Sequence, residues 1–313
     1  MSDFVRVVEV GPRDGLQNEK TLVPATTKIA LIDRLSACGF QVVEATSFVS
    51  PKWVPQLADA EEVLAGIQRR DGIAYPVLVP NAKGLERALA AGVRHIAVFT
   101  AASDAFNLKN TNIDVDGSLE RLKPVVEQAR AAGVSVRGYV STVLGCPYQG
   151  HVPLADVVRV AGALHAMGCD EISLGDTIGV GTPANAREML LACAQTVPMA
   201  QLAVHFHDTY GQALANVLAC LEAGVRVVDS AVGGLGGCPY AKGASGNLAT
   251  EDLLYMLHGL GLRTGIDLPA VTDTAVWISG KLGRKPASKL ATVALANATS
   301  RSDALDTASS TVG

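Results

Sequence analysis

The sequence has few aromatic residues and no excess of charge of either sign. Phenylalanine, tryptophan and tyrosine make up 4% of the 313 residues, and 26 Lys and Arg stand against 30 Asp and Glu, a formal net charge of −4. Because the two signs are interspersed along the chain, the charge balance gives no support for a nucleic-acid partner or an anionic membrane surface. A core with so few aromatic residues must be built from Val, Leu, Ile and Ala.

The sequence also lacks a long apolar run and paired cysteines. No stretch reaches the roughly 18 uncharged apolar residues that a membrane span needs, so we predict none. The first strand-like segment, at 5–10, begins too early to leave room for a cleaved presequence. The six cysteines are scattered without a CxxC pair, so no disulfide framework is expected. We therefore expect a cytoplasmic protein with free thiols.

Short runs rich in Val and Ile alternate with segments of helical length. The predicted strands are 5–10, 42–47, 73–80, 95–101, 135–142, 171–176, 202–207 and 227–232. The predicted helices are 25–38, 55–67, 83–91, 117–132, 154–167, 183–196, 210–223 and 250–260. Apolar strands that alternate with helices predict a parallel sheet covered on both faces, and eight such units close most economically into a (β/α)8 TIM barrel. An open, doubly wound sheet is the alternative.

Glycines and the C-terminal segment complete the predicted organisation. Five predicted helices end at a glycine, at positions 39, 92, 133, 168 and 224, which indicates left-handed helix caps. A further helix at 269–281 belongs to a C-terminal helical extension that starts near residue 265. We expect one domain over 1–290 and a partly disordered tail over 291–313, which is rich in Ala, Ser, Thr and Asp.

Polar residues stand at the C-terminal ends of several predicted strands, where barrel enzymes carry their active sites. The first strand leads into Arg13 and Asp14, the second contains Glu44 and Ser47, and the sixth contains Ser173 and ends at Asp176. Glu44 could form a purely structural ion pair with Arg13. That pairing is compatible with catalysis, because a paired arginine can still donate hydrogen bonds to a substrate oxygen.

Two histidines, His205 and His207, end the seventh predicted strand. Side chains alternate along a strand, so both point to the same face and could bind one metal ion. The alternative is a pair of hydrogen-bonded histidines in a polar barrel mouth. Asp14 favours the metal, because barrel closure brings the first strand near the seventh and eighth. Imidazole and carboxylate ligands without a thiolate pair suit Mg²⁺ or Mn²⁺ better than a structural zinc site.

A loop with six glycines among fifteen residues, 233–247, follows the eighth predicted strand. A loop in this place could bind a phosphate. It also contains Cys238, a lone thiol among glycines, which favours a movable catalytic acid or nucleophile over an inert cysteine. The other five cysteines are interpreted as packing residues, with the least support at Cys146. Asn247 could cap the following helix or bind the metal.

Three segments together resemble one enzyme family. Residues 8–19, VEVGPRDGLQNE, residues 44–55, EATSFVSPKWVP, and the glycine-rich loop through Cys238 and Asn247 look like those of 3-hydroxy-3-methylglutaryl-CoA lyases. The resemblance extends over residues 4–290. It implies a TIM barrel from a group of metal-dependent enzymes that make or break carbon–carbon bonds.

The resemblance also implies roles for individual residues. A divalent cation, Mg²⁺ or Mn²⁺, would be held by Asp14, His205, His207 and Asn247, with Arg13 and Cys238 catalytic and Glu44 and Asp176 as supporting acids. Either His205 or Asp176 would be the base, and Arg13, Ser47 and Ser173 are candidates for substrate binding. The implied reaction cleaves an acyl-CoA, 3-hydroxy-3-methylglutaryl-CoA, to acetyl-CoA and acetoacetate in a homo-oligomer, either a dimer or a tetramer.

Other functions stay open on the sequence alone. An aldolase or a synthase of the same enzyme group would use a similar metal and arginine, although the cysteine in the glycine-rich loop favours the lyase. A longer 3-hydroxy-3-alkylglutaryl-CoA is an alternative substrate, because chain-length preference depends on pocket shape. A non-catalytic metal-binding scaffold predicts a missing catalytic group, and none is missing.

Overall fold

In the computed structural model, which describes residues 3–237 and 246–297, nine parallel strands form one sheet. The strands are β1 (Arg6–Glu9), β2 (Val42–Val43), β3 (Thr46–Ser47), β4 (Val77–Leu78), β5 (His95–Ala101), β6 (Ser135–Ser141), β7 (Glu171–Asp176), β8 (Leu202–Phe206) and β9 (Val227–Ser230). Neighbouring strands follow the order β2-β1-β9-β8-β7-β6-β5-β4-β3. Apart from the break between β2 and β3, this is the sequential order of a barrel.

The sheet closes on itself through residues 42–47. β2 pairs with β1, and β3 pairs with β4. Between them the Glu44 N–H donates to the Glu9 carbonyl at 2.8 Å, and the Ala45 N–H donates to the Pro76 carbonyl at 2.9 Å. β2 and β3 are therefore two parts of one barrel strand that is bonded along both edges. This closure confirms the predicted (β/α)8 barrel and excludes the open sheet.

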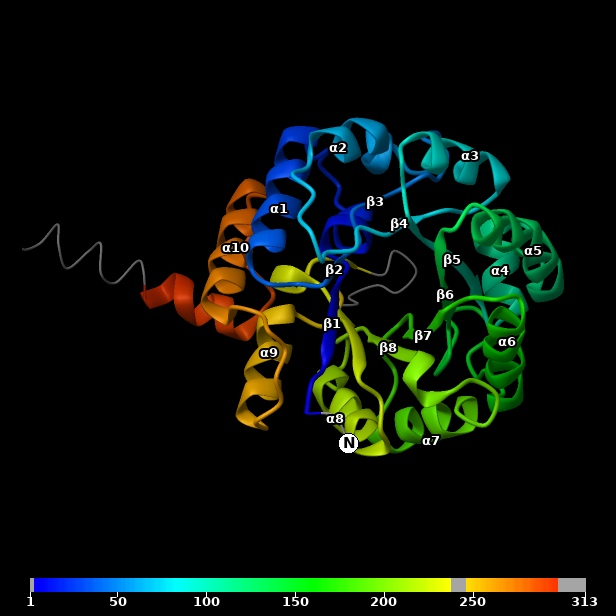
Figure 1. Cartoon of the computed structure of the whole chain (residues 1–313). Helices are drawn as coiled ribbons and strands as arrows, with labels where there is room; N and C mark the ends of the chain where they lie inside the picture. Colours follow the sequence, from blue (N-terminus) through cyan, green and yellow to red (C-terminus); the bar gives the residue numbers. More distant parts are fainter. Residues whose placement is uncertain (1–2, 238–245, 298–313) are drawn as a thin grey trace, which may run out of the picture.

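Helices surround the barrel as an outer ring (Figure 1). In the described ranges they are α1 (Ala25–Ala37), α2 (Ala60–Gly66), α3 (Ala82–Ala90), α4 (Asp104–Thr111), α5 (Val115–Ala131), α6 (Leu154–Ala166), α7 (Pro183–Cys193), α8 (Ala213–Ala223), α9 (Thr250–Gly259) and α10 (Leu268–Lys281). None of these helices is both long enough and apolar enough to span a membrane. The five glycines predicted to end helices all have positive φ, from 70° at Gly92 to 118° at Gly224, which confirms the left-handed caps.

The structure corrects several predicted boundaries. The strand predicted at 73–80 is reduced to β4, because Pro76 and Pro80 lack the N–H groups that a ladder needs. The helix predicted at 55–67 is split into a 3-10 turn, Pro55–Leu57, and α2, with Asp59 at the break paired to Lys28. The sequence analysis missed α4, whose first turn is capped by the Ser103 hydroxyl.

The described C-terminal region contains two helical segments. One is α10, in the place of the expected extension, which contacts α1 and α9. The other covers residues 289–297. Residues 298–313, which make up most of the predicted tail, lie outside the described part of the chain.

The barrel interior contains charged side chains as well as apolar ones. Arg6 on β1 pairs with Glu171 on β7, and Arg137 on β6 lies 3.0 Å from Glu171 and 2.7 Å from Asp229 on β9. We call Arg6, Glu171, Arg137 and Asp229 the interior ion pairs. They stand at the first or third residues of their strands, below the C-terminal ends where the predicted site residues lie.

Candidate metal centre and active site

A single helical turn after β1 places Arg13 and Asp14 at the barrel mouth. This turn, Gly11–Gly15, is a π-helix, a form often found at functional sites. The Gly11 N–H donates to Oε1 of the buried Glu9 at 2.8 Å, and a Cβ atom at Gly11 would lie only 2.6 Å from the same oxygen. The turn therefore requires glycine at its first position.

β8 and the segment after the glycine-rich loop bring His205, His207 and Asn247 together. His205 lies in β8 and His207 follows it, with their ring centroids 5.4 Å apart. His207 and Asn247 form an antiparallel bridge, supported by a 3.0 Å bond from the Leu248 N–H to the Phe206 carbonyl. Gly236, at φ 116°, passes so near that a Cβ atom there would lie 2.7 Å from Asn247 Nδ2.

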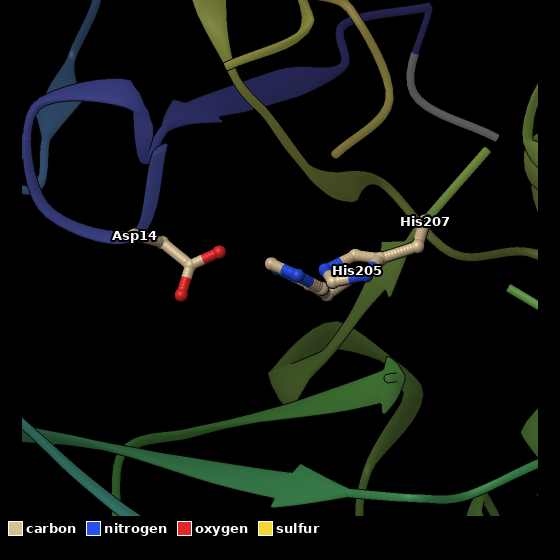
Figure 2. Close-up of side chains that lie close together, drawn as sticks. All are labelled: Asp14, His205 and His207. Atoms are coloured by element: carbon tan, nitrogen blue, oxygen red, sulfur yellow. The ribbon is translucent and has the colours of Figure 1, made fainter. Parts of the chain in front are cut away.

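Asp14, His205 and His207 form a group that can hold a metal ion. One side-chain atom from each lies within 4.8 Å of the others. Figure 2 shows the Asp14 carboxylate and the two imidazole rings pointing toward one another. Asn247 joins them by donating a 2.8 Å hydrogen bond from Nδ2 to Asp14 Oδ2.

The donor atoms of this group fit a cation. Among the residues that the structure describes, Asn247 Oδ1 and His207 Nδ1 are buried without a hydrogen-bond partner. Buried polar atoms are rarely left unpaired unless a water, an ion or a ligand meets them. One carboxylate, two imidazoles and one amide form a mixed oxygen and nitrogen set, which suits Mg²⁺ or Mn²⁺.

The electrostatics at Asp14 and His207 favour the protonation states that bind metals. Burial alone would raise the pKa of Asp14, but Arg13 and the two histidines hold it well below its usual value. Burial and the neighbouring His205 lower the pKa of His207 to about 4. Near neutral pH the site therefore presents an ionised carboxylate and a neutral His207, the forms that coordinate a cation.

Arg13 is held between two carboxylates. Its Nη2 atom lies 2.8 Å from Glu44 Oε2, its Nη1 atom lies 2.6 Å from Asp14 Oδ1, and its guanidinium lies 5.5 Å from the centroid of the Tyr139 ring. The Tyr139 hydroxyl donates to Glu44 Oε2 at 3.3 Å. The Arg13–Glu44 ion pair is thus present, and it fixes an arginine that still lines the cavity.

A cavity of about 960 Å³ opens above the metal group. Arg13, Asp14, His205 and His207 line it together with three cationic side chains, Lys20, Lys109 and Arg121, and with Trp53, which is 81% exposed. The cavity thus combines a deep end that can bind a metal with outer walls that carry positive charge.

Comparisons with known proteins agree with this geometry. A family model described as HMGL-like matches residues 4–278. The mitochondrial hydroxymethylglutaryl-CoA lyase of Bos taurus is 61% identical over 287 residues, which cover 92% of this chain and 88% of that protein. The chain belongs to the hydroxymethylglutaryl-CoA lyase family.

Two solved structures extend the comparison within the hydroxymethylglutaryl-CoA lyase family. The Pseudomonas aeruginosa enzyme is 55% identical with a TM-score of 0.93, covering 95% of this chain and 99% of the other. The HMG-CoA lyase of Acinetobacter baumannii, solved in complex with coenzyme A and 3-methylmalate, is 41% identical with a TM-score of 0.89, covering 93% of this chain and 95% of the other.

Three residues predicted for the hydroxymethylglutaryl-CoA lyase site lie behind the cavity wall. Asp176 is fully buried and accepts hydrogen bonds from the N–H groups of Val180 and Gly181, while burial raises its pKa. Ser47 accepts a 3.1 Å bond from the Val49 N–H, and Ser173 donates to Asp229 at 2.9 Å. None of the three is among the residues that line the cavity in the described part of the chain.

Cys238, the predicted catalytic thiol, lies outside the described residues. Its neighbour Gly237 is described. The Gly237 carbonyl accepts a 2.9 Å hydrogen bond from Asn18, and Gly237 lines the cavity. The chain therefore reaches the cavity at the residue that precedes Cys238.

Sequence reasoning missed three residues that support the site of this hydroxymethylglutaryl-CoA lyase family member. They are Tyr139 at the cavity, and Arg137 and Asp229 of the interior ion pairs. Tyr139 joins Glu44 to Arg137, and Asp229 contacts His205. Arg137 and Asp229 each interrupt an apolar strand, which is the same signal that identified Glu44. Tyr139 gave no such signal, because an aromatic residue in a strand usually packs in the core.

Proposed function

We propose that the protein is a divalent-metal-dependent carbon–carbon lyase that cleaves 3-hydroxy-3-methylglutaryl-CoA to acetyl-CoA and acetoacetate. The observation that carries this proposal is the position of Arg13 beside the Asp14, His205 and His207 group in one cavity. A cation site and a fixed guanidinium together can stabilise negative charge at two places, and the reaction places it first on the C3 oxygen and then on the thioester oxygen.

The reaction is a retro-Claisen cleavage. The C3 hydroxyl loses its proton and the oxygen becomes the ketone of acetoacetate, while the electron pair of the C2–C3 bond passes to a thioester enolate. Protonation of that enolate at carbon gives acetyl-CoA. A divalent cation, Mg²⁺ or Mn²⁺, held by Asp14, His205, His207 and Asn247 would supply Lewis acidity toward the hydroxyl and carboxylate oxygens.

Arg13 stabilises the enolate in this scheme. Arg13 is 6% exposed, and its guanidinium is fixed by Glu44 and Asp14 before any substrate binds. A donor held in place in this way needs no reorganisation when charge develops on the thioester oxygen. Glu44 acts as the acid that holds Arg13 in position.

His205 and Asp176 are the two candidate bases for the C3 hydroxyl. His205 Nδ1 lies 3.2 Å from Asp229, so Nε2 faces the cavity, and one nitrogen cannot hold a cation and accept a proton at the same time. Asp176 is buried with a raised pKa but does not line the cavity. Asp176→Asn tests the second candidate: a loss of kcat with unchanged Mn²⁺ affinity assigns the base to Asp176, and unchanged kcat removes Asp176 from this role.

Cys238 is the proposed acid that protonates the enolate carbon. Its sequence neighbour Gly237 lines the cavity, and a thiol can deliver a proton to carbon near neutral pH. Cys238→Ser is expected to keep metal and substrate binding while kcat falls strongly. Unchanged activity would remove Cys238 from the chemistry.

The cavity supports an acyl-CoA substrate. Lys20, Lys109 and Arg121 line its walls, and their charges suit the phosphates of coenzyme A, while the metal group and Arg13 suit the acyl end. Ser47 and Ser173 contribute indirectly, since their hydroxyls bond within the barrel. A longer 3-hydroxy-3-alkylglutaryl-CoA remains the alternative substrate.

A coupled assay for acetyl-CoA release tests the proposed function. The protein is assayed with 3-hydroxy-3-methylglutaryl-CoA and with a longer 3-alkyl homologue, each with chelator and with added Mg²⁺ or Mn²⁺. We expect activity on the shorter substrate that chelator abolishes and either metal restores. Activity that survives chelation would contradict the proposed metal dependence. Activity on the longer homologue alone would show that the homologue, not 3-hydroxy-3-methylglutaryl-CoA, is the substrate.

Two further properties belong to this proposal. A cytoplasmic location is supported by the five described cysteines, all free and buried, because a reducing compartment keeps thiols free. We also propose a homo-oligomer, dimer or tetramer, which light scattering on the purified protein measures directly.

A further inference from the structure

Asp229 is a buried carboxylate in the barrel interior that contacts His205. It lies on β9, is 1% exposed, and has partners from three other strands. Arg137 Nη2 donates to its Oδ1 at 2.7 Å, while Ser173 Oγ donates to its Oδ2 at 2.9 Å and His205 Nδ1 lies 3.2 Å from the same Oδ2. Each carboxylate oxygen is therefore committed.

These contacts fix the imidazole of His205 chemically. A carboxylate paired with a guanidinium can only accept hydrogen bonds, so His205 Nδ1 must donate to it. A neutral imidazole carries one proton, so with that proton on Nδ1 the lone pair resides on Nε2, on the side of the ring that faces the cavity. Both roles considered for His205, metal ligand and base, require that lone pair.

We propose that Asp229 is a positioning residue, held by Arg137 and Ser173, that fixes His205 in the Nδ1–H tautomer and presents Nε2 to the cavity. This inference rests on the proposed metal-dependent function. Ligating histidines commonly donate their second N–H to a carboxylate, and loss of that partner typically lowers metal affinity or activity by about 10–100-fold.

Asp229→Asn provides a sharp test because Arg137 determines how the new amide is oriented. The guanidinium donates to the Oδ1 position, so the amide oxygen must occupy it and the NH₂ group must face His205 and Ser173. An NH₂ group can only donate, which requires His205 Nδ1 to accept and moves the imidazole proton to Nε2. The variant keeps the size of the side chain but reverses the tautomer.

The control is Glu171→Gln. Glu171 also pairs with Arg137 and also lies in the barrel interior, so this variant removes the same charge from the same arginine. None of the hydrogen bonds described for Glu171 involves His205. Any general effect of neutralising an interior acid should therefore appear in both variants, whereas an effect on the tautomer should appear only in Asp229→Asn.

The first readout is Mn²⁺ affinity of the full-length protein, followed by electron paramagnetic resonance. We expect the dissociation constant to rise about 10–100-fold in Asp229→Asn and to stay within about twofold of the parent value in Glu171→Gln. The second readout is imidazole ¹⁵N NMR of the metal-free proteins at a pH at which the His205 imidazole is neutral, with His205→Gln used to assign the signal. We expect the Nδ1–H form in the parent and the Nε2–H form in Asp229→Asn.

The results separate this inference from the proposed function. An unchanged tautomer together with parental Mn²⁺ affinity in Asp229→Asn would overturn the role of Asp229, and parental lyase activity would leave the function intact. Equal weakening in both variants would also overturn it, because the effect would then be general. If the parent protein binds Mn²⁺ but does not cleave 3-hydroxy-3-methylglutaryl-CoA, the proposed function is wrong. The role of Asp229 is still tested in that case, because the NMR and Mn²⁺-affinity measurements do not depend on lyase activity.

Discussion

The metal centre and the interior ion pairs use similar residue types within one barrel, but their charges are balanced differently. In the interior ion pairs each charged side chain contacts an opposite charge, and the atoms left without a hydrogen-bond partner among the described residues are the donors Arg6 Nε and Arg137 Nε. At the metal centre Asn247 Oδ1, His207 Nδ1 and Glu44 Oε1 are buried without partners among the described residues. The two regions are in contact through Asp229 and His205.

This difference indicates what each region does. Charges that neutralise one another are fixed, and they position their neighbours without needing a ligand. Buried polar atoms that the protein leaves unpaired are costly unless a ligand or ion meets them. The interior ion pairs therefore balance their charges within the protein, whereas the cavity end presents buried oxygen and nitrogen atoms that a cation can meet.

Arg13→Lys is the strongest predicted perturbation of the cavity end. Lysine keeps the positive charge between Glu44 and Asp14 but lacks the planar guanidinium. Only the guanidinium has enough N–H donors to bond to both carboxylates and to a substrate oxygen at once. We expect kcat to fall by about 10²–10³-fold while Mn²⁺ affinity stays close to that of the parent. Near-normal kcat with metal bound would remove Arg13 from the catalytic role.

His207→Ala removes one arm of the metal group. Loss of a residue that hydrogen-bonds to a metal ligand lowers metal affinity by up to about 100-fold. Loss of the ligand itself should cost at least as much, so we expect Mn²⁺ affinity to fall by about 100-fold or more. Equilibrium dialysis with the purified variant measures the change. If the variant binds Mn²⁺ like the parent, the four-residue ligand set is wrong.

Glu171→Ala tests the interior ion pairs. Removing this acid leaves Arg6 and Arg137 without one partner each, but Glu171 is partly exposed, so water offsets part of the loss. We expect the free energy of unfolding to fall by about 1–3 kcal/mol, within the range for an unsatisfied buried group. Denaturant titration gives this value, and kcat should change less than about twofold. A large loss of kcat in a stably folded variant would show that the two regions are not separable.

The smallest predicted effect concerns a buried acid whose contacts are with backbone groups. Burial raises the pKa of Glu251 to about 8, although the Gly233 N–H donates a hydrogen bond to it. At Asp229 the opposite holds, because the neighbouring Arg137 and His205 outweigh burial and lower the pKa. Between pH 4.5 and about 8 the folded state therefore binds more protons at Glu251 than the unfolded state, so its contribution to stability is lost as pH rises.

Glu251→Gln should flatten that pH dependence. The glutamine cannot ionise but can still accept the Gly233 hydrogen bond, so we expect it to be more stable than the parent at pH 8, with no gain at pH 4. Thermal unfolding at both pH values provides the comparison. A variant that is destabilised equally at both pH values would show that the carboxylate is required for packing rather than titrated.

The barrel and most of the metal centre could be predicted because they depend on local rules. Alternation along β8 puts His205 and His207 on one face, and glycine caps mark where helices end. The shortening of β4 could also have been predicted from Pro76 and Pro80, but the apolar run from 73 to 80 favoured a longer strand.

The rest depends on contacts between distant segments. The role of Asp229 follows from the meeting of β6, β7, β8 and β9, which spacing along the chain does not indicate. The same holds for Asn247, for which capping and ligation were both open until its bridge to His207 placed it beside Asp14. Asp176 ends β7 and accepts hydrogen bonds from N–H groups of the loop that follows, and its place in the site stays a prediction.

The central claim is that one cation completes the cavity end of the barrel and makes the protein a lyase. Metal-free protein can be titrated with Mn²⁺ while bound metal and acetyl-CoA release from 3-hydroxy-3-methylglutaryl-CoA are measured on the same samples. We expect activity to rise in proportion to metal occupancy and to reach its maximum at one ion per chain. Full activity in the metal-free protein would contradict it.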